Sequence, residues 1–200
     1  MIYLVRHGLT WANEEHRYCG STDLPLSDQG IRILNDLKKA AIWPIVDFCY
    51  HSGLQRTLQT ASILFTAAPM VELKSLREFD FGDFELKNYD ELKDNPAYIH
   101  WISQIMTEPC PNGDSREQFH CRVLAGWAQV LAAQSDKPDQ SIAVVTHGGV
   151  IATVMNEIFP GQKHFYEWQP SCGSGYRLEI QQGQVIDFIE ICATTAAGNY

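Results

Sequence analysis

The stretch Ile2-Tyr3-Leu4-Val5-Arg6-His7-Gly8-Leu9-Thr10 decides how the rest of the chain is interpreted. Four apolar, β-favouring residues lead directly into an arginine, a histidine and a glycine, so a buried strand ends where polar chemistry begins. In open α/β sheets, ligands bind beyond the carboxyl ends of the parallel strands. Arg6 and His7 stand at such an end, and Gly8 permits the sharp turn that brings backbone N–H groups close to an anion. Taken alone, the stretch is equally compatible with an ordinary polar loop.

Length and composition predict one soluble globular domain over residues 1–200. The chain can bury a full core, and its hydrophobic and charged contents of 45% and 20% are ordinary for such a protein. The formal net charge of −9 disfavours nucleic acid and acidic membrane surfaces as partners, so a phosphorylated substrate would need a local cluster of cations. Because no apolar run approaches the ~20 residues of a membrane span and no export signal is evident, a cytoplasmic location is expected. Residues 193–200 are expected to form a loose tail.

The cysteines are scattered along the chain without a C-x-x-C pair. In a chain without an export signal this pattern predicts free thiols rather than disulfides, and it disfavours a zinc site. The sequence also lacks other metal-ligand spacings and the P-loop pattern G-x-x-x-x-G-K-[ST]. We therefore expect neither a metal nor another cofactor, and any phosphoryl chemistry would depend on side chains.

Strands and helices alternate over most of the chain, which predicts βαβ units and a mostly parallel sheet. Residues 10–18 carry no pattern and are expected to form a loop. Ser27 precedes apolar residues at helical spacing and is expected to cap the first helix. A strand over 45–50 leads into the next helix, for which Ser52 is a plausible cap. A hairpin over 175–191 is expected to close the sheet.

Three of these units deliver basic side chains to strand ends. Arg56 lies one turn into the second helix, from which its guanidinium group can reach back toward the strand. The strand over 141–146 runs into His147 and two glycines, which repeats the arrangement around His7. Guanidinium groups grip pairs of oxygen atoms, and helix N-termini attract anions. Together with Arg6, these residues predict a pocket for a phosphoryl group.

Residues 79–121 depart from the alternation and are expected to form an inserted helical lid. Asn88 is a plausible cap for a short helix, a second helix is expected over 97–106, and either Asp114 or Ser115 is expected to cap the long helix that follows. Carboxylates outnumber cations in this segment, and aromatic residues are frequent. Most of these rings are expected to form the core of the lid, and some could stack on a planar group.

These motifs together resemble the histidine phosphatase superfamily, whose members are phosphoglycerate mutase-like. Residues 6–13 are similar to the signature R-H-G-x-T-x-x-N, and residues 52–61, 76–85 and 146–149 are similar to the blocks that carry the second arginine, the acid and the second histidine. The blocks occur in the expected order over residues 2–158. The resemblance implies an α/β fold, a three-layer α/β/α sandwich with a mostly parallel sheet and an inserted helical lid.

The resemblance also implies the roles of individual residues. His7 would be the nucleophile that becomes phosphorylated, and Glu78 would protonate the leaving oxygen. The catalytic group would comprise His7, Glu78, Arg6, Arg56 and His147, and the phosphate would be bound by Arg6, His7, Asn13, Arg56, His147 and Gly148.

Elementary chemistry agrees with these roles. A neutral imidazole is a competent nucleophile at about pH 7, and neighbouring guanidinium groups oppose its protonation. Glu78 would need a raised pKa, which bound phosphate and the ring of Phe79 or Phe81 could supply. Three other carboxyl groups could act as the acid, namely Asp80, Asp83 and Glu85. Glu78 is preferred to them only because of its position in the motif.

The resemblance implies a metal-independent phosphomonoesterase. Within the superfamily, the short length and residues 81–85 and 111–115 are most similar to the α-ribazole-5′-phosphate phosphatases of cobalamin biosynthesis. The expected partner is therefore a small phosphorylated substrate, either α-ribazole 5′-phosphate or another phosphomonoester. A broad-specificity phosphatase, a phosphoglycerate mutase and a non-catalytic phosphate-binding domain on the same fold are the alternatives. The acidic lid disfavours the mutase. A homodimer is also compatible with the sequence.

Overall fold

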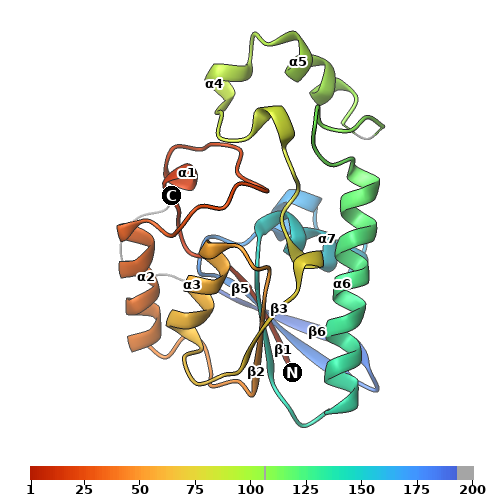
Figure 1. Cartoon of the computed structure of the whole chain (residues 1–200). Helices are drawn as coiled ribbons and strands as arrows, with labels where there is room; N and C mark the ends of the chain where they lie inside the picture. The colour runs from red at the N-terminus through yellow and green to blue at the C-terminus, as the bar shows by residue number, and fades with distance from the viewer. Residues whose placement is uncertain (106, 193–200) are drawn as a thin grey trace.

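A six-stranded mixed sheet lies at the centre of the computed structural model, which describes residues 1–105 and 107–192 (Figure 1). The strand order is β3-β2-β4-β1-β5-β6. The first four strands in this order are parallel, whereas β5 runs antiparallel to β1 and to β6. The strands are β1 (Ile2–Arg6), β2 (Phe48–His51), β3 (Met70–Glu72), β4 (Ile142–Thr146), β5 (Gly175–Gln181) and β6 (Gln184–Ile191).

Helices cover both faces of this sheet. On one side lie α2 (Asp28–Lys39) and α3 (Gln55–Leu64), and on the other lie α6 (Arg116–Asp136) and α7 (Gly148–Ile158) (Figure 1). The strands alternate between two cores accordingly, because successive side chains of a strand point to opposite faces. Leu4 packs with α6 and α7, whereas its neighbour Val5 packs with α2 and α3. The prediction of a three-layer α/β/α sandwich with a mostly parallel sheet is confirmed.

The register of β1 and β4 brings two distant parts of the sequence together. The two strands are parallel neighbours, with Arg6 opposite Thr146. The backbone N–H of His7 donates to the carbonyl of Thr146 at 2.9 Å, which extends the pairing by one residue. The residues that follow both strands therefore emerge side by side at the carboxyl edge of the sheet.

Residues 10–18 contain a short helix that the sequence analysis did not predict. This helix, α1 (Trp11–Glu14), is held by a capping box in which the Thr10 side chain accepts from the backbone N–H of Asn13, and the Asn13 side chain accepts from that of Thr10. The prediction for Ser27 is confirmed, because its side chain accepts from the backbone N–H of Gly30 at the start of α2.

Two predictions around β2 are wrong. The strand begins at Phe48 rather than at residue 45, and Ile45 is 90% exposed. Ser52 does not cap α3, because the N-cap position is Leu54 and no side chain bonds there. The Ser52 hydroxyl accepts only a long bond of 3.5 Å from the backbone N–H of Leu54, and its closer partners are Thr57 and His147.

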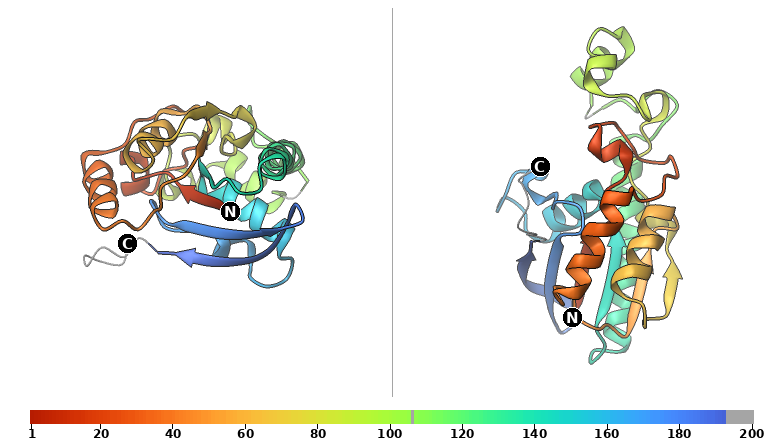
Figure 2. Two further views of the ribbon diagram at one scale, coloured as in Figure 1. Left: turned by 90° about the horizontal axis from the view of Figure 1, so that it is seen from below. Right: turned by 90° about the vertical axis from the view of Figure 1, so that its left-hand side faces the viewer.

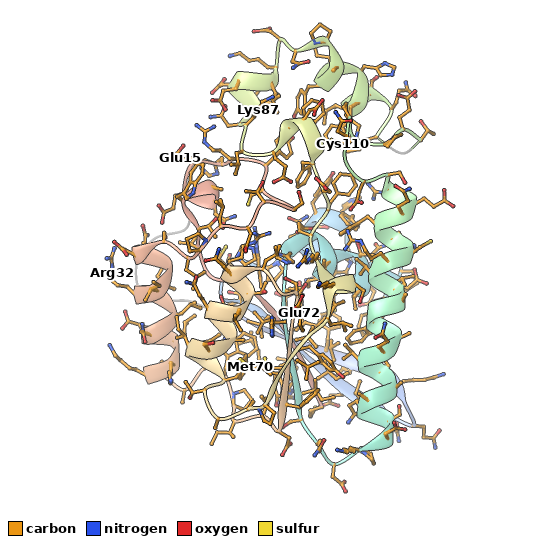
Figure 3. The ribbon with its side chains drawn as sticks, viewed as in Figure 1. Glu15, Arg32, Met70, Glu72, Lys87 and Cys110 are labelled. Carbon is orange, nitrogen blue, oxygen red and sulfur yellow. The ribbon has the colours of Figure 1, made fainter. Side chains whose placement is uncertain are left out.

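Most of the segment between β3 and α6 lies beyond the carboxyl ends of the strands, as the right-hand view of Figure 2 shows, whereas Leu76 near its start packs in the core with α6. It comprises η1 (Lys74–Leu76), η2 (Gly82–Phe84), α4 (Tyr89–Leu92) and α5 (Pro96–Ser103). Part of the segment forms its own core, in which Cys110, labelled in Figure 3, packs with the ring of Trp101 and its neighbours. That residues 79–121 function as a lid stays a prediction.

Both helix caps predicted in this segment are confirmed. Asn88 caps α4, as predicted, and Ser115 rather than Asp114 caps α6. The helix predicted over 97–106 ends at Ser103. Position 106 and the predicted tail over 193–200 lie outside the described residues.

Two further findings concern the described ranges as a whole. Within residues 1–105 and 107–192, no helix is long and apolar enough to cross a membrane. All six cysteines are free, as the sequence predicted.

Candidate active site

The two histidines at the ends of β1 and β4 lie in contact. The ring centroids of His7 and His147 are 5.1 Å apart, and the ring planes meet at 64°. Both side chains are buried, with exposed fractions of 5% and 0%. The structure therefore brings together the residue pair on which the predicted site depends.

His7 is held in a single tautomer. Its Nδ1 atom lies 2.7 Å from the carbonyl oxygen of Gly8, and because a carbonyl can only accept, Nδ1 carries the hydrogen. Burial lowers the pKa of His7 well below its ordinary value, and the positive charges of Arg56 and Arg6 lower it further, against the opposing effect of the Gly8 bond. The ring is consequently neutral at about pH 7, with the lone pair on Nε2 available for attack.

Backbone carbonyls hold the guanidinium group of Arg56. It donates to the carbonyls of Thr22 at 2.7 Å and Gly20 at 2.6 Å, and the side chain is fully buried in the second position of α3. Its Nε atom is buried and has no hydrogen-bond partner in the described part of the chain. The carbonyls orient the cation without neutralising it, so it keeps its charge for an anion.

Arg6 is oriented in the same way at the end of β1. Its Nη1 atom donates to the carbonyl of Pro170 at 2.8 Å, and its buried Nε has no partner among residues 1–105 and 107–192. Gly148 keeps the helix α7 close to it, since a Cβ at that position would lie 3.3 Å from Cζ of Arg6. Two cations and the start of a helix therefore meet at one place.

His147 occupies the N-cap position of α7. Its ring is held through Nε2, whereas the ring of His7 is held through Nδ1. Nε2 lies 2.8 Å from the Ser52 hydroxyl, whereas the buried Nδ1 has no partner in the part of the chain that the structure describes. Burial is the main reason why its pKa lies well below the ordinary value, and the charges of Arg56 and Arg6 contribute. The sequence analysis missed this contact of Ser52, for which the only signal was its place directly after a strand.

Glu78 is anchored by two backbone N–H groups. Oε1 accepts from Phe79 at 2.9 Å, and Oε2 accepts from Gly149 at 2.8 Å. Burial nevertheless raises the pKa of this carboxyl above its ordinary value, against the lowering effects of these bonds and of Arg6 and Arg56. Gly149 is required for this contact, because a Cβ there would collide with Oε1 of Glu78.

The carboxyl groups that rival Glu78 are engaged elsewhere. Glu85 accepts from the backbone of residues 20–22, Asp80 accepts from Ser21 and Gly82, and Asp83 accepts from Asn112. Unlike Glu78, they do not line the cavity of about 300 Å³ that opens beside these residues. These contacts favour Glu78 as the carboxyl group that faces a substrate.

Asn13 lines the same cavity but uses its oxygen locally. Its Oδ1 accepts from the backbone N–H of Thr10 at 3.0 Å and from the Thr10 hydroxyl at 2.9 Å, within the capping box of α1. Its amide nitrogen is therefore the group that could donate to an anion.

A cavity of about 300 Å³ opens beside these polar groups, although His7, Arg56 and His147 are not among the residues that line it. Arg6, Asn13, Glu78 and Gly148 line its polar end. Rings from several elements line much of the rest, beside polar side chains such as Arg17, Arg116 and Asn156, and one of these elements is η3 (Phe165–Trp168), which the sequence analysis did not single out. The rings belong to Tyr18, Phe79, Phe81, Trp101, Phe119, Phe165 and Tyr166. The cavity thus joins an anion-binding end to an aromatic chamber.

Within residues 1–105 and 107–192, no three His, Cys, Asp or Glu side chains are grouped so that they could bind an ion.

Known proteins resemble this chain over most of its length. Residues 2–187 match the family model described as the histidine phosphatase superfamily (branch 1). The chain is 31% identical over 166 residues to the uncharacterized phosphatase PhoE of Bacillus subtilis, which corresponds to 80% of this chain and 78% of that protein. It is 30% identical over 158 residues to the adenosylcobalamin/alpha-ribazole phosphatase of Salmonella typhimurium, covering 77% of each. The crystal structure of the alpha-ribazole phosphatase from Shigella flexneri has the same fold, with a TM-score of 0.83 over 99% of each chain at 24% identity.

Proposed function

Because the chain belongs to the histidine phosphatase superfamily, we propose that it is a metal-independent phosphomonoesterase that acts through a phosphohistidine at His7. The observation that carries the proposal is the state of His7. Its Nδ1–H donates to the Gly8 carbonyl, so that the lone pair of Nε2 is available beside two guanidinium groups. A neutral, oriented imidazole next to cations is what attack on a phosphoryl group requires.

In the first step, Nε2 of His7 attacks phosphorus while the bond to the leaving oxygen breaks. The transition state spreads negative charge over the equatorial oxygens. Arg6, Arg56 and His147 stabilise that charge, and the amide of Asn13 and the backbone N–H of Gly148 complete the binding site. Their unpartnered nitrogen atoms support this role, because Nε–H of both arginines and Nδ1 of His147 are buried without partners in the described residues.

Glu78 handles the protons of both steps. Its raised pKa favours the protonated form that donates to the leaving oxygen. The resulting carboxylate then removes a proton from the water that attacks the phosphohistidine, and this step restores His7 and protonated Glu78. The products are the alcohol and inorganic phosphate, and no proton is gained or lost by the enzyme over the cycle.

The physiological substrate that fits best is α-ribazole 5′-phosphate, which would be converted to α-ribazole in cobalamin biosynthesis. A cavity of about 300 Å³ is of the size that binds small ligands, and its aromatic walls favour a planar leaving group. The name of the Salmonella relative supports this substrate. We propose that residues 79–121, which contribute several of these rings, act as a lid over the leaving group.

One observation favours a second candidate, a phosphoglycerate mutase. Arg116 also lines the cavity, and its guanidinium group lies 5.0 Å from the centre of the Phe165 ring. A cation at that place could hold the second acidic group of a phosphoglycerate. The aromatic rings that line the cavity argue for the phosphatase.

The test is replacement of the nucleophile. His7→Ala is expected to abolish hydrolysis of p-nitrophenyl phosphate and to abolish acid-labile, alkali-stable labelling of the protein by a ³²P-labelled substrate. His16→Ala, which changes an exposed histidine, is the matched control and is expected to retain both. Turnover by His7→Ala near that of the control would refute the proposal.

The same assay identifies the substrate. The wild-type enzyme is expected to have its highest kcat/KM for α-ribazole 5′-phosphate among a set of phosphomonoesters that includes 3-phosphoglycerate. Isomerisation of 3-phosphoglycerate at a comparable rate would favour the mutase. Binding of phosphate without turnover of any ester would indicate a non-catalytic phosphate-binding domain.

A further inference from the structure

A chain of hydrogen bonds connects His147 to the start of α3. Nε2 of His147 lies 2.8 Å from Oγ of Ser52, and Oγ of Ser52 lies 3.0 Å from Oγ1 of Thr57. The Thr57 hydroxyl lies 2.8 Å from the carbonyl oxygen of Leu54. The side chains of His147, Ser52 and Thr57 are all fully buried. Each hydroxyl in this chain has a single hydrogen to donate.

The direction of these bonds follows from their fixed end. The Leu54 carbonyl can only accept, so the Thr57 hydroxyl donates its hydrogen there. Oγ1 of Thr57 then faces Ser52 with a lone pair, and the Ser52 hydroxyl must donate to it. If Ser52 donated to His147 instead, two oxygen lone pairs would face each other at 3.0 Å in a buried place, which is unfavourable. His147 is therefore the donor, through Nε2–H.

From this geometry we propose that Ser52 is a positioning residue that holds neutral His147 in the tautomer with hydrogen on Nε2. The two histidines of the site then have opposite tautomers, because His7 carries its hydrogen on Nδ1. Nδ1 of His147, which is buried without a partner in the described residues, is left with a lone pair. It can donate to a phosphoryl oxygen only after it gains a proton.

The site consequently takes up one proton together with a phosphoryl dianion. The proton comes from solvent, or from the substrate when this is a monoanion, and forms a bond to Nδ1 of His147. The ring becomes an imidazolium that donates to the oxygen through Nδ1–H while Nε2–H stays bonded to Ser52. The charges balance, since dianion and imidazolium together carry the same charge as a monoanion beside a neutral ring.

The charged groups around His147 explain why the proton arrives with the anion. Burial is the main factor that disfavours an imidazolium at His147, and the charged neighbours add to it: Arg56 from α3, His7 and Arg6 from the end of β1, and Arg122 from α6. Glu78 is held by Gly149, two residues away from His147. A dianion among these groups reverses the local balance and favours protonation of the ring.

The first test is nuclear magnetic resonance of the substrate-free protein with ¹⁵N-labelled histidine, because two-bond couplings identify which nitrogen of a neutral ring carries hydrogen. The wild type is expected to show Nε2–H for His147 and Nδ1–H for His7, with the signals assigned from His147→Gln and His7→Gln. In Thr57→Val, Ser52 loses its acceptor and donates to His147, which changes that ring to Nδ1–H. Thr57→Ser keeps the hydroxyl and is the matched control, for which we expect the wild-type tautomer.

Either of two results for the wild type and Thr57→Val would overturn the inference. The first is Nδ1–H on His147 in the wild type, and the second is an unchanged tautomer in folded Thr57→Val. Ser52→Ala provides a second variant, which removes the acceptor and is expected to show both tautomers of His147. A single Nε2–H tautomer in Ser52→Ala would also count against the inference.

The second test measures the proton itself. Calorimetric titration with inorganic phosphate at about pH 8, where phosphate is largely a dianion, is repeated in buffers of different ionisation enthalpy. The wild type and Thr57→Ser are expected to take up about one proton more per phosphate bound than Thr57→Val, because the ring of that variant already carries Nδ1–H and any uptake by Glu78 is common to all three proteins. Equal uptake by all three would refute the inference.

The inference rests on the proposed function for the arrival of a phosphoryl group, but the two can fail separately. If phosphate does not bind to the wild type, the proposed function fails, while the resonances of the free protein still decide the tautomer of His147. If phosphate binds and esters are hydrolysed but Thr57→Val leaves the tautomer unchanged, the role of Ser52 fails alone.

Discussion

The two buried histidines are expected to make the stability of the protein depend steeply on pH. His7 and His147 are 5% and 0% exposed, and the pKa of each lies well below its ordinary value, mainly because of burial and then because of the neighbouring charges, with Arg56 the largest. In the unfolded chain both rings titrate at about pH 6.5. Below that pH the unfolded state binds more protons than the folded state. The free energy of unfolding should therefore fall as the pH falls through this range, and neither ring contributes above it.

The expected size of the effect follows from the number of buried rings. Each histidine that is protonated only in the unfolded state contributes about 1.4 kcal/mol per pH unit, so His7 and His147 together contribute about 2.7 kcal/mol per unit. This is a large share of the total stability of a domain, about 5–15 kcal/mol. Glu78 acts in the opposite direction. Its pKa is raised by burial, so between the unfolded and folded pKa values the folded state keeps a proton that the unfolded state has lost.

Urea unfolding of the wild type, His147→Gln and His16→Gln over about pH 5–7 provides the test. In His147→Gln the dependence of unfolding free energy on pH should be shallower by about 1.4 kcal/mol per unit below about pH 6. The exposed His16 is the control, and its variant should have the wild-type slope. Glu78 is the same in all three proteins, so its contribution cancels in the comparison. Equal slopes for the wild type and His147→Gln would refute the reasoning that this ring is neutral in the folded protein.

Four further predictions concern catalysis. Glu78→Gln should lower kcat/KM by about 10²–10⁴-fold for an alkyl phosphate and less for p-nitrophenyl phosphate, whose leaving group needs no proton; equal losses would contradict the role as acid. Gly149→Ala should show the same pattern in steady-state kinetics, because the new Cβ collides with the Glu78 carboxyl group. Arg56→Lys should lower kcat/KM by about 10²-fold or more, because the single nitrogen of an ammonium group cannot occupy the positions of Nη1, Nη2 and Nε at once; wild-type kinetics would show that the fork is not needed. Dialysis against EDTA should leave activity unchanged, and loss that a divalent cation restores would reveal a metal requirement.

The assembly of the site could be predicted because it depends on parallel strands. A strand that ends in Arg6-His7 and a strand that ends in His147 deliver their side chains to the same edge once both belong to a parallel sheet. The sequence could not predict the collision that makes Gly149 necessary. That requirement depends on where the Glu78 carboxyl group lies, and Glu78 comes from a connection 71 residues earlier in the chain.

The errors in the sequence analysis have a common physical cause, which is competition from distant partners. Ser52 has the residue type and the place of a helix cap, but its hydroxyl bonds to His147, 95 residues away. Residues 45–47 have a strand-like composition, but pairing with β4 starts with Phe48 opposite Ile142. Asp47 instead accepts hydrogen bonds from Ser141, just before β4 begins. Local rules find segments that can form a strand or a cap, and tertiary pairing decides which of them do.

The acidic character of residues 79–121 shows why a charge count alone cannot identify the substrate. The carboxylate of Glu85 accepts the backbone N–H groups of Gly20, Ser21 and Thr22 at 2.9–3.2 Å. The carbonyls of Gly20 and Thr22 accept from the guanidinium group of Arg56. The peptide groups of this loop are therefore polarised between an anion and a cation, and such chains of hydrogen bonds strengthen one another. The negative charge of Glu85 thus helps to hold the buried guanidinium group of Arg56 in place and does not act against a phosphorylated substrate. The residues that line the cavity are therefore better evidence about the leaving group than the net charge of the segment above it.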